Sequence, residues 1–118
     1  MITIKNLTKN KNIEVMHAKS PLALTKGLMF KKKGNMLLEF PLSARHSIWM
    51  LFMHYPLDLI YIDKQKKITE IKKNIPPITL NPKTWKTYHP KEKAKYVLEI
   101  QAGEPHDFSA GDILEFDT

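Results

Sequence analysis

Apolar and polar residues alternate in short segments along most of this chain, with proline and glycine between the segments. Residues 2–7 and 13–18 follow this alternation and are joined by a polar stretch, which predicts an opening β-hairpin. Further segments of strand character span residues 36–40, 48–53, 57–63, 67–75, 96–100 and 111–116. The pattern predicts a mainly β protein, a compact antiparallel β-sandwich or barrel of about seven or eight strands.

One segment departs from the strand period. Ser20 offers an N-cap oxygen, Pro21 suits the first helical position, and Gly27 can adopt the left-handed conformation that ends a helix. These residues predict one short helix near residues 20–27.

The middle of the chain is its most apolar part. Residues 48–53 are apolar on both faces, which predicts a central strand covered on each side. Residues 57–63 and 67–75 are predicted to form the next hairpin, and the lysines of the second segment indicate an exposed or edge strand. Residues 96–100 alternate as a half-buried strand.

Length and composition bound the class of protein. The chain has 118 residues, of which 42% are hydrophobic, so we expect a single domain over residues 1–118. The absence of cysteine excludes thiol catalysis, thiolate zinc sites and iron–sulfur clusters. The polar N-terminal segment lacks the apolar core of a signal peptide, and His54, Pro56 and Asp58 interrupt the longest apolar run. We therefore expect a cytoplasmic protein without membrane insertion.

Charge is unevenly distributed along the chain. The net charge is +7, yet the segment beyond Lys95 has six acidic residues and neither lysine nor arginine, so the fold could bring oppositely charged ends together. A basic protein can attract nucleic acid, and the segment 83–91 interleaves lysines with Trp85 and Tyr88. No RNP motif, KH loop or helix-turn-helix pattern accompanies it, so nucleic-acid binding is possible but not favoured.

Asp58 is the strongest single candidate for a functional side chain. A carboxylate inside an apolar strand must be paired, hydrogen-bonded or neutral if it is buried. Asp58 could cap a turn after Pro56 by accepting backbone amides, or it could serve as a ligand-binding or acid–base group. The structural role is the commoner of the two.

Methionines lie beside histidines at two places, Met53 beside His54 and Met16 beside His17, which raises the possibility of a soft copper site. Met50 and Met53 are an odd number of positions apart, so in a strand they point to opposite faces. The histidines also lack the spacing of structural metal sites. We therefore predict no metal site and no cofactor.

Four aromatic residues are candidates for a binding surface. Trp49, Tyr55, Trp85 and Tyr88 could line a groove, and the last two lie in a proline-bounded loop of the kind that often carries function. The alternative is that these rings anchor the core and the loop.

Several short motifs, taken together and in order, cover most of the chain: Gly27-Leu28-Met29-Phe30, Gly34 with Met36-Leu37 and Phe40, Trp49-Met50, Pro56-Leu57-Asp58 with Ile60 and Asp63, Tyr96-Val97-Leu98-Glu99 with Ala102-Gly103, and Gly111-Asp112. On these motifs the chain resembles the family known as domain of unknown function 192. The resemblance implies a compact, mainly β sandwich or barrel with a short helix, and it implies no activity. Many bacterial members carry Lys-Asn-Thr after the Trp-Met pair, where this chain has Leu51-Phe52-Met53, and many carry an export signal.

Three functional hypotheses follow. The leading one is a non-catalytic binding module for a small molecule, glycan or protein, with a site drawn from Asp58, Trp49, His54, Tyr55, Trp85 and Tyr88. The second is an enzyme that uses Asp58 as acid or base with help from His54 or Arg45. The third is a basic nucleic-acid-binding protein.

Overall fold

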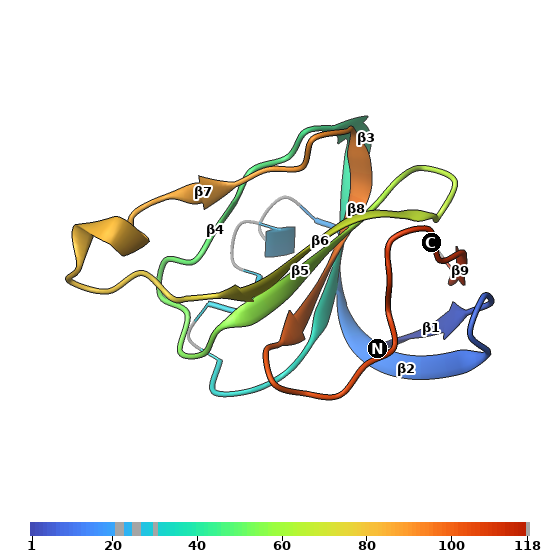
Figure 1. Ribbon diagram of the computed structural model, residues 1–118, viewed down its shortest axis with the longest axis horizontal. Helices are drawn as coiled ribbons and strands as arrows, with labels where there is room; N and C mark the ends of the chain where they lie inside the picture. The colour runs from blue at the N-terminus through green and yellow to red at the C-terminus, as the bar shows by residue number, and fades with distance from the viewer. Residues whose placement is uncertain (21–22, 25–26, 30, 118) are drawn as a thin grey trace.

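A computed structural model describes residues 1–20, 23–24, 27–29 and 31–117 (Figure 1). Its elements follow in chain order: β1 (Ile2–Asn6), β2 (Lys11–Ala18), β3 (Met36–Ala44), β4 (Ile48–Trp49), β5 (Leu57–Ile62), β6 (Ile68–Ile75), a 3-10 turn η1 (Pro82–Thr84), β7 (Thr87–Tyr88), β8 (Ala94–Gln101) and β9 (Leu114–Glu115).

Seven of these strands form one sheet in the order β6-β5-β8-β3-β2-β1-β9. Neighbouring strands pair antiparallel, except that β2 and β3 are parallel. The sheet curls into a half-barrel, and its two edges meet at one end. There the Ile68 amide donates to the Asp112 carbonyl at 2.9 Å, and the Leu114 amide donates to the Lys66 carbonyl at 2.8 Å. The expectation of a mainly β fold is confirmed, in the barrel-like form.

Apolar side chains gather on both faces of this sheet. Because side chains alternate along a strand, each central strand contributes to both clusters. The inner core lies within the curl and includes Ile4, Leu37, Ile60, Leu98 and Phe116. The outer core lies between the other face of the sheet and the segments that cover it, and includes Leu28, Met50, Leu59, Tyr61 and Val97.

The most buried strands of the main sheet are β5 and β8, both of which have neighbours on each side. The prediction of a central strand at residues 48–53 is wrong. Only Ile48–Trp49 is extended, and it pairs with β7 in a separate two-stranded sheet. The chain then turns, with the Met53 amide bonded to the Met50 carbonyl. The segment is apolar because it covers the outer face of the main sheet, where Ile48 and Met50 are buried.

Other local predictions fare better. The opening hairpin is confirmed by the pairing of β1 with β2, and the second hairpin by the pairing of β5 with β6, which is an edge strand.

Half of the predicted helix over residues 20–27 lies outside the described residues. In the described part, the Ser20 hydroxyl accepts the Ala23 amide, and the Leu24 and Gly27 amides bond to carbonyls four residues earlier.

The two oppositely charged ends of the chain do meet. β1 pairs with β9, and Lys9 lies 3.2 Å from the Asp112 carboxylate. Asp112 is buried and also accepts the Asn6 side-chain amide at 2.9 Å and the Ser109 backbone amide at 3.0 Å. These hydrogen bonds outweigh the effect of burial and lower the pKa of Asp112. Within the described part of the chain, no helix is long and apolar enough to cross a membrane.

Candidate ligand pocket

Asp58 is buried on the inner face of β5 and has two hydrogen-bond partners. Its Oδ1 accepts the Asn74 backbone amide at 2.9 Å, and its Oδ2 accepts from His106 Nε2 at 3.0 Å. The other ring nitrogen of His106 accepts the Phe108 amide at 3.3 Å. Both nitrogens of the imidazole are therefore occupied, and neither is available to take a proton from a substrate.

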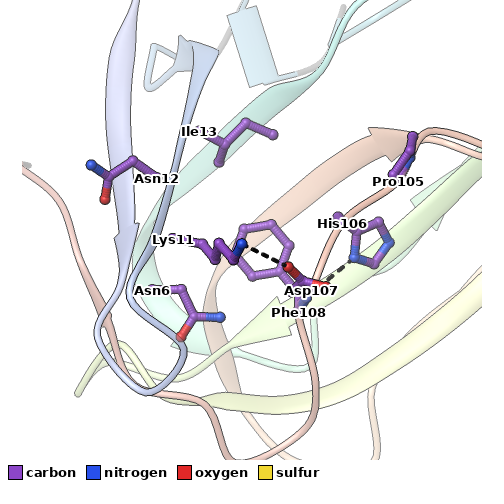
Figure 2. A pocket seen from close by; sticks show the side chains of 8 residues that line it. All are labelled: Asn6, Lys11, Asn12, Ile13, Pro105, His106, Asp107 and Phe108. Atoms are coloured by element: carbon purple, nitrogen blue, oxygen red, sulfur yellow. Dashed lines mark hydrogen bonds and ion pairs between the residues drawn. The ribbon is translucent and has the colours of Figure 1, made fainter.

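A pocket of about 260 Å³ lies beside this pair, between the β1–β2 hairpin and the segment that precedes β9. Figure 2 shows that Lys11 reaches Asp107 across it, at 4.0 Å, while His106 lies at one side. The ionisable groups here contact one another or Asp58. The arrangement ties the C-terminal segment to the barrel.

A second pocket, also of about 260 Å³, lies on the opposite face of the sheet. It is lined by Leu24, Gly27, Leu28, Met29, Leu38, Phe40, Ser47, Ile48, Trp49, Met53 and Glu99. Strand alternation places Glu99 on the outer face of β8, beside Leu59 of β5. Glu99 is the one ionisable residue among the described residues that line this pocket.

The Glu99 carboxyl is the unusual group of this pocket. The residue is only 5% exposed, and no hydrogen bond from the described residues reaches its carboxyl oxygens. A Cβ atom placed on Gly27 would lie 3.6 Å from Glu99 Oε1, so the covering segment passes directly over the carboxyl. Gly27 has a φ of +50°, which favours glycine at this position.

Burial raises the pKa of Glu99 to about 8. The carboxyl is therefore mainly protonated at neutral pH and can both donate and accept a hydrogen bond. Burial, with the nearby charges of Glu99 and Glu104, raises the pKa of Tyr55 to about 12. Burial also raises the pKa of Tyr61. A pocket with mainly apolar side chains and one uncharged carboxyl suits a mostly apolar molecule that carries a polar group.

The other sequence-predicted site residues are distributed over several places. Trp49 forms part of the Glu99 pocket wall and is 49% exposed. The Tyr55 hydroxyl donates to the Gly34 carbonyl at 2.9 Å, so this ring anchors the outer core. Trp85 and His54 are exposed, and Tyr88 is partly buried. The structure does not bring Asp58 together with Trp49, because they lie on opposite faces of the sheet.

Tyr88 has a separate role at the junction of the two sheets. Its carbonyl accepts the Tyr61 hydroxyl at 3.1 Å, and its own hydroxyl is buried without a hydrogen-bond partner in the described part of the chain. Among the described residues, no group of three or more histidine, aspartate or glutamate side chains could hold a metal ion.

Sequence reasoning missed two residues, His106 and Glu99. His106 lies 48 positions from Asp58, and no local pattern indicates that the two side chains meet. Glu99 had a signal: Val97 points to the same face of β8 and is apolar, so this face is not the solvent face of a half-buried strand.

A family model described as "DUF192: Uncharacterized ACR, COG1430" matches residues 2–116. The chain belongs to the DUF192 family. It is 34% identical over 118 aligned positions to a UPF0127 protein of Pyrococcus furiosus, covering 94% of this chain and 95% of that one. A UPF0127 protein of Thermococcus kodakarensis is also 34% identical, over 85% of this chain and 62% of its own length.

Two crystal structures share the fold of this DUF192 protein. One is described as a putative transcription regulator from Sinorhizobium meliloti, with a TM-score of 0.78 and 24% identity over 98% of this chain and 91% of that one. The other is a protein of unknown function from Novosphingobium aromaticivorans, with a TM-score of 0.76 and 19% identity over 97% of this chain and 82% of that one. These likenesses show the fold alone.

The Glu99 pocket draws its walls from segments far apart in the chain that carried the resemblance to DUF192. Gly27, Leu28 and Met29 come from the first motif, Trp49 from the central motif, and Glu99 from the motif on β8. Residues that are scattered in sequence therefore surround one cavity.

Proposed function

We propose that this protein is a non-catalytic binding module whose site is the Glu99 pocket. The observation that carries the proposal is the buried carboxyl of Glu99, which has no hydrogen-bond partner among the described residues and lies in a cavity lined mainly by apolar side chains. An unpaired polar group costs free energy when it is buried, and a ligand that bonds to it recovers that cost.

The chemistry of the walls supports a small molecule rather than a glycan. Phe40, Trp49 and Met53 give apolar surface, whereas a glycan needs many hydrogen-bonding groups. The described lining holds no lysine, arginine or histidine that could pair with an anion, which favours a neutral ligand. The ligand class is a small, mostly apolar molecule with one group that accepts a hydrogen bond.

Binding fits this site better than catalysis. General acid–base chemistry commonly pairs two ionisable groups within hydrogen-bond reach of the reacting atoms. The described lining of the pocket offers Glu99 alone. Asp58, the acid–base candidate of the sequence, is engaged with Asn74 and His106 on the other face of the sheet.

A fragment screen by protein-observed NMR tests the proposal with three proteins: wild type, Glu99→Gln and Glu99→Met. Glutamine keeps a donor and an acceptor, whereas methionine fills a similar volume without either. We expect fragments that shift the resonances of Gly27, Trp49 and Met53 to bind Glu99→Met about tenfold more weakly, the loss of one hydrogen bond to a desolvated group. Glu99→Gln should stay within a few-fold of wild type.

The pH dependence of fragment binding gives an independent check. Neutral fragments that bond to the protonated carboxyl should bind wild type more weakly above a pH of about 8, the pKa of Glu99. They should bind Glu99→Gln equally below and above that pH. Fragments that bind only beside His106, or that bind Glu99→Met as well as wild type, would refute the assignment of the site.

A further inference from the structure

The two-stranded sheet β4–β7 and the loop before β7 form a lobe that projects from the half-barrel. We call residues 76–86 the tip loop; it contains η1 and connects β6 to β7. In Figure 1 the tip loop extends to the left, away from the curled sheet and from both termini. It carries large apolar side chains at its surface, with Leu80 95% exposed and Trp85 60% exposed.

A groove of about 560 Å³ joins the tip loop to β4. It is lined by Trp49, Leu51, Ile78, Trp85, Lys86 and Thr87. Its walls are almost entirely apolar, and the polar side chains that border it are those of Lys86 and Thr87. The exposed apolar surface therefore continues from Leu80 at the tip to Trp49, which also lines the Glu99 pocket.

The tip loop satisfies many of its polar groups internally. The Trp85 indole N–H donates to the Thr79 carbonyl at 2.6 Å, and the Thr84 hydroxyl donates to the Asn81 carbonyl and accepts the Thr79 amide. The Asn81 side chain accepts the Lys83 amide. Groups that are already paired cost little to remove from water, so this loop can leave water more cheaply than an ordinary polar loop.

Charge around the lobe has one sign. Residues 40–57 and 71–91 contain no aspartate or glutamate, whereas Lys83 and Lys86 are exposed on either side of Trp85. Exposed tryptophan and leucine beside lysine, without acids, match the interface of an anionic bilayer: the apolar rings enter the headgroup region and the ammonium groups reach the phosphates.

We propose that the tip loop docks this protein onto the surface of a bilayer with anionic headgroups, with Leu80 and Trp85 in the headgroup region. The protein lies on the membrane and does not span it. The proposal is independent of the proposed function, although docking would also bring the mouth of the Glu99 pocket beside the lipid phase, because Trp49 borders both.

Vesicle binding tests the proposal directly. The full chain is mixed with vesicles of phosphatidylcholine alone, or of phosphatidylcholine with phosphatidylglycerol, and binding is followed by co-sedimentation. Trp49 and Trp85 are the only tryptophans in the sequence, so intrinsic fluorescence reports on the lobe itself. We expect binding to the anionic vesicles, a blue shift of emission, and quenching by brominated lipid.

Matched variants separate docking from general charge. The double variant Lys83→Gln, Lys86→Gln should weaken binding to anionic vesicles about thirty-fold, because each lysine contributes a factor of about five and the two factors multiply. Leu80→Ser should weaken it about tenfold through lost apolar contact. The controls come from the β1–β2 and β5–β6 turns, which lie on the side of the molecule away from the tip loop (Figure 1). Leu7 is exposed in the first turn and Lys64 in the second; Leu7→Ser should have no effect and Lys64→Gln only a small one.

Three results would overturn the proposal. The first is no binding to anionic vesicles. The second is equal loss in the tip-loop and control variants, which would mean diffuse attraction by the net charge. The third is binding of single-stranded oligonucleotides, with the same dependence on Lys83 and Lys86, by a protein that leaves vesicles unbound. Glu99→Met should dock as wild type does, so failure of the ligand site and failure of docking are distinguishable.

Discussion

Asp58 and His106 are joined by a buried hydrogen bond of 3.0 Å, from His106 Nε2 to Asp58 Oδ2, that connects β5 to the segment before β9. Each partner is held a second time, Asp58 by the Asn74 amide and His106 by the Phe108 amide. This pair fixes where the C-terminal segment rests against the barrel. The pattern fits the structural reading of Asp58 that the sequence already favoured.

Asp58→Asn should therefore weaken the fold. An asparagine amide facing His106 Nε2 would place two donors together unless the imidazole loses its bond from Phe108. We expect a loss of about 2–4 kcal/mol in the free energy of unfolding, measured with urea. Fragment binding at Glu99 should persist in the folded fraction. A variant as stable as wild type would contradict the structural role.

Glu99 should make stability depend on pH in an unusual direction. Its pKa in the folded state is about 8, above the ordinary 4.5, so the folded state holds an extra proton between these values. The proton's contribution to the free energy of unfolding is complete below pH 4.5. It is lost as the pH rises towards 8, at about 1.4 kcal/mol per pH unit. Glu99→Gln removes this pH dependence. In urea titrations, the free energy of unfolding of the variant relative to wild type should therefore grow as the pH rises from 4.5 to about 8. A constant difference would show that Glu99 is ionised in the folded protein.

Asp112 should show the opposite dependence. Its folded pKa lies below the ordinary 3.8, so its contribution is present above that pH and is lost as the pH falls below it. Asp112→Asn should cost about 1–3 kcal/mol at neutral pH, because Lys9 loses its charge partner and Asn6 and Ser109 then donate to a neutral amide oxygen in place of a carboxylate. Asp107→Asn is the control: its ion pair with Lys11 is exposed and should contribute almost nothing.

The Tyr61 hydroxyl connects the main sheet to the lobe through the Tyr88 carbonyl. Tyr61→Phe should cost about 1 kcal/mol and should speed amide exchange in β7. Tyr96→Phe is the matched control, since that ring is also buried in the sheet but its hydroxyl has no hydrogen bond within the described residues. Equal exchange in both variants would mean that packing alone holds the lobe.

The strand pairs close in sequence could be predicted, and the layers could not. The hairpins β1–β2 and β5–β6 follow from alternation and polar turns, which are local signals. Residues 48–53 were misassigned because an apolar segment that covers a sheet has the same composition as one within it. Glu99 is hard to identify from the sequence for a related reason: the burial of both faces of β8 depends on covering segments far away in the chain. In β8 itself, only the apolar Val97 indicates that the Glu99 face is buried.

Closure of the half-barrel has a consequence for the order of folding. The last strand, β9, bonds to β1, about a hundred residues earlier, and the segment around it bonds to the start of β6. During synthesis, β1 and the start of β6 leave the ribosome without these partners, so the edges of the sheet stay open until residues 111–115 emerge. Pairings this distant are slow to form, and the open edges would be the vulnerable point of the nascent chain.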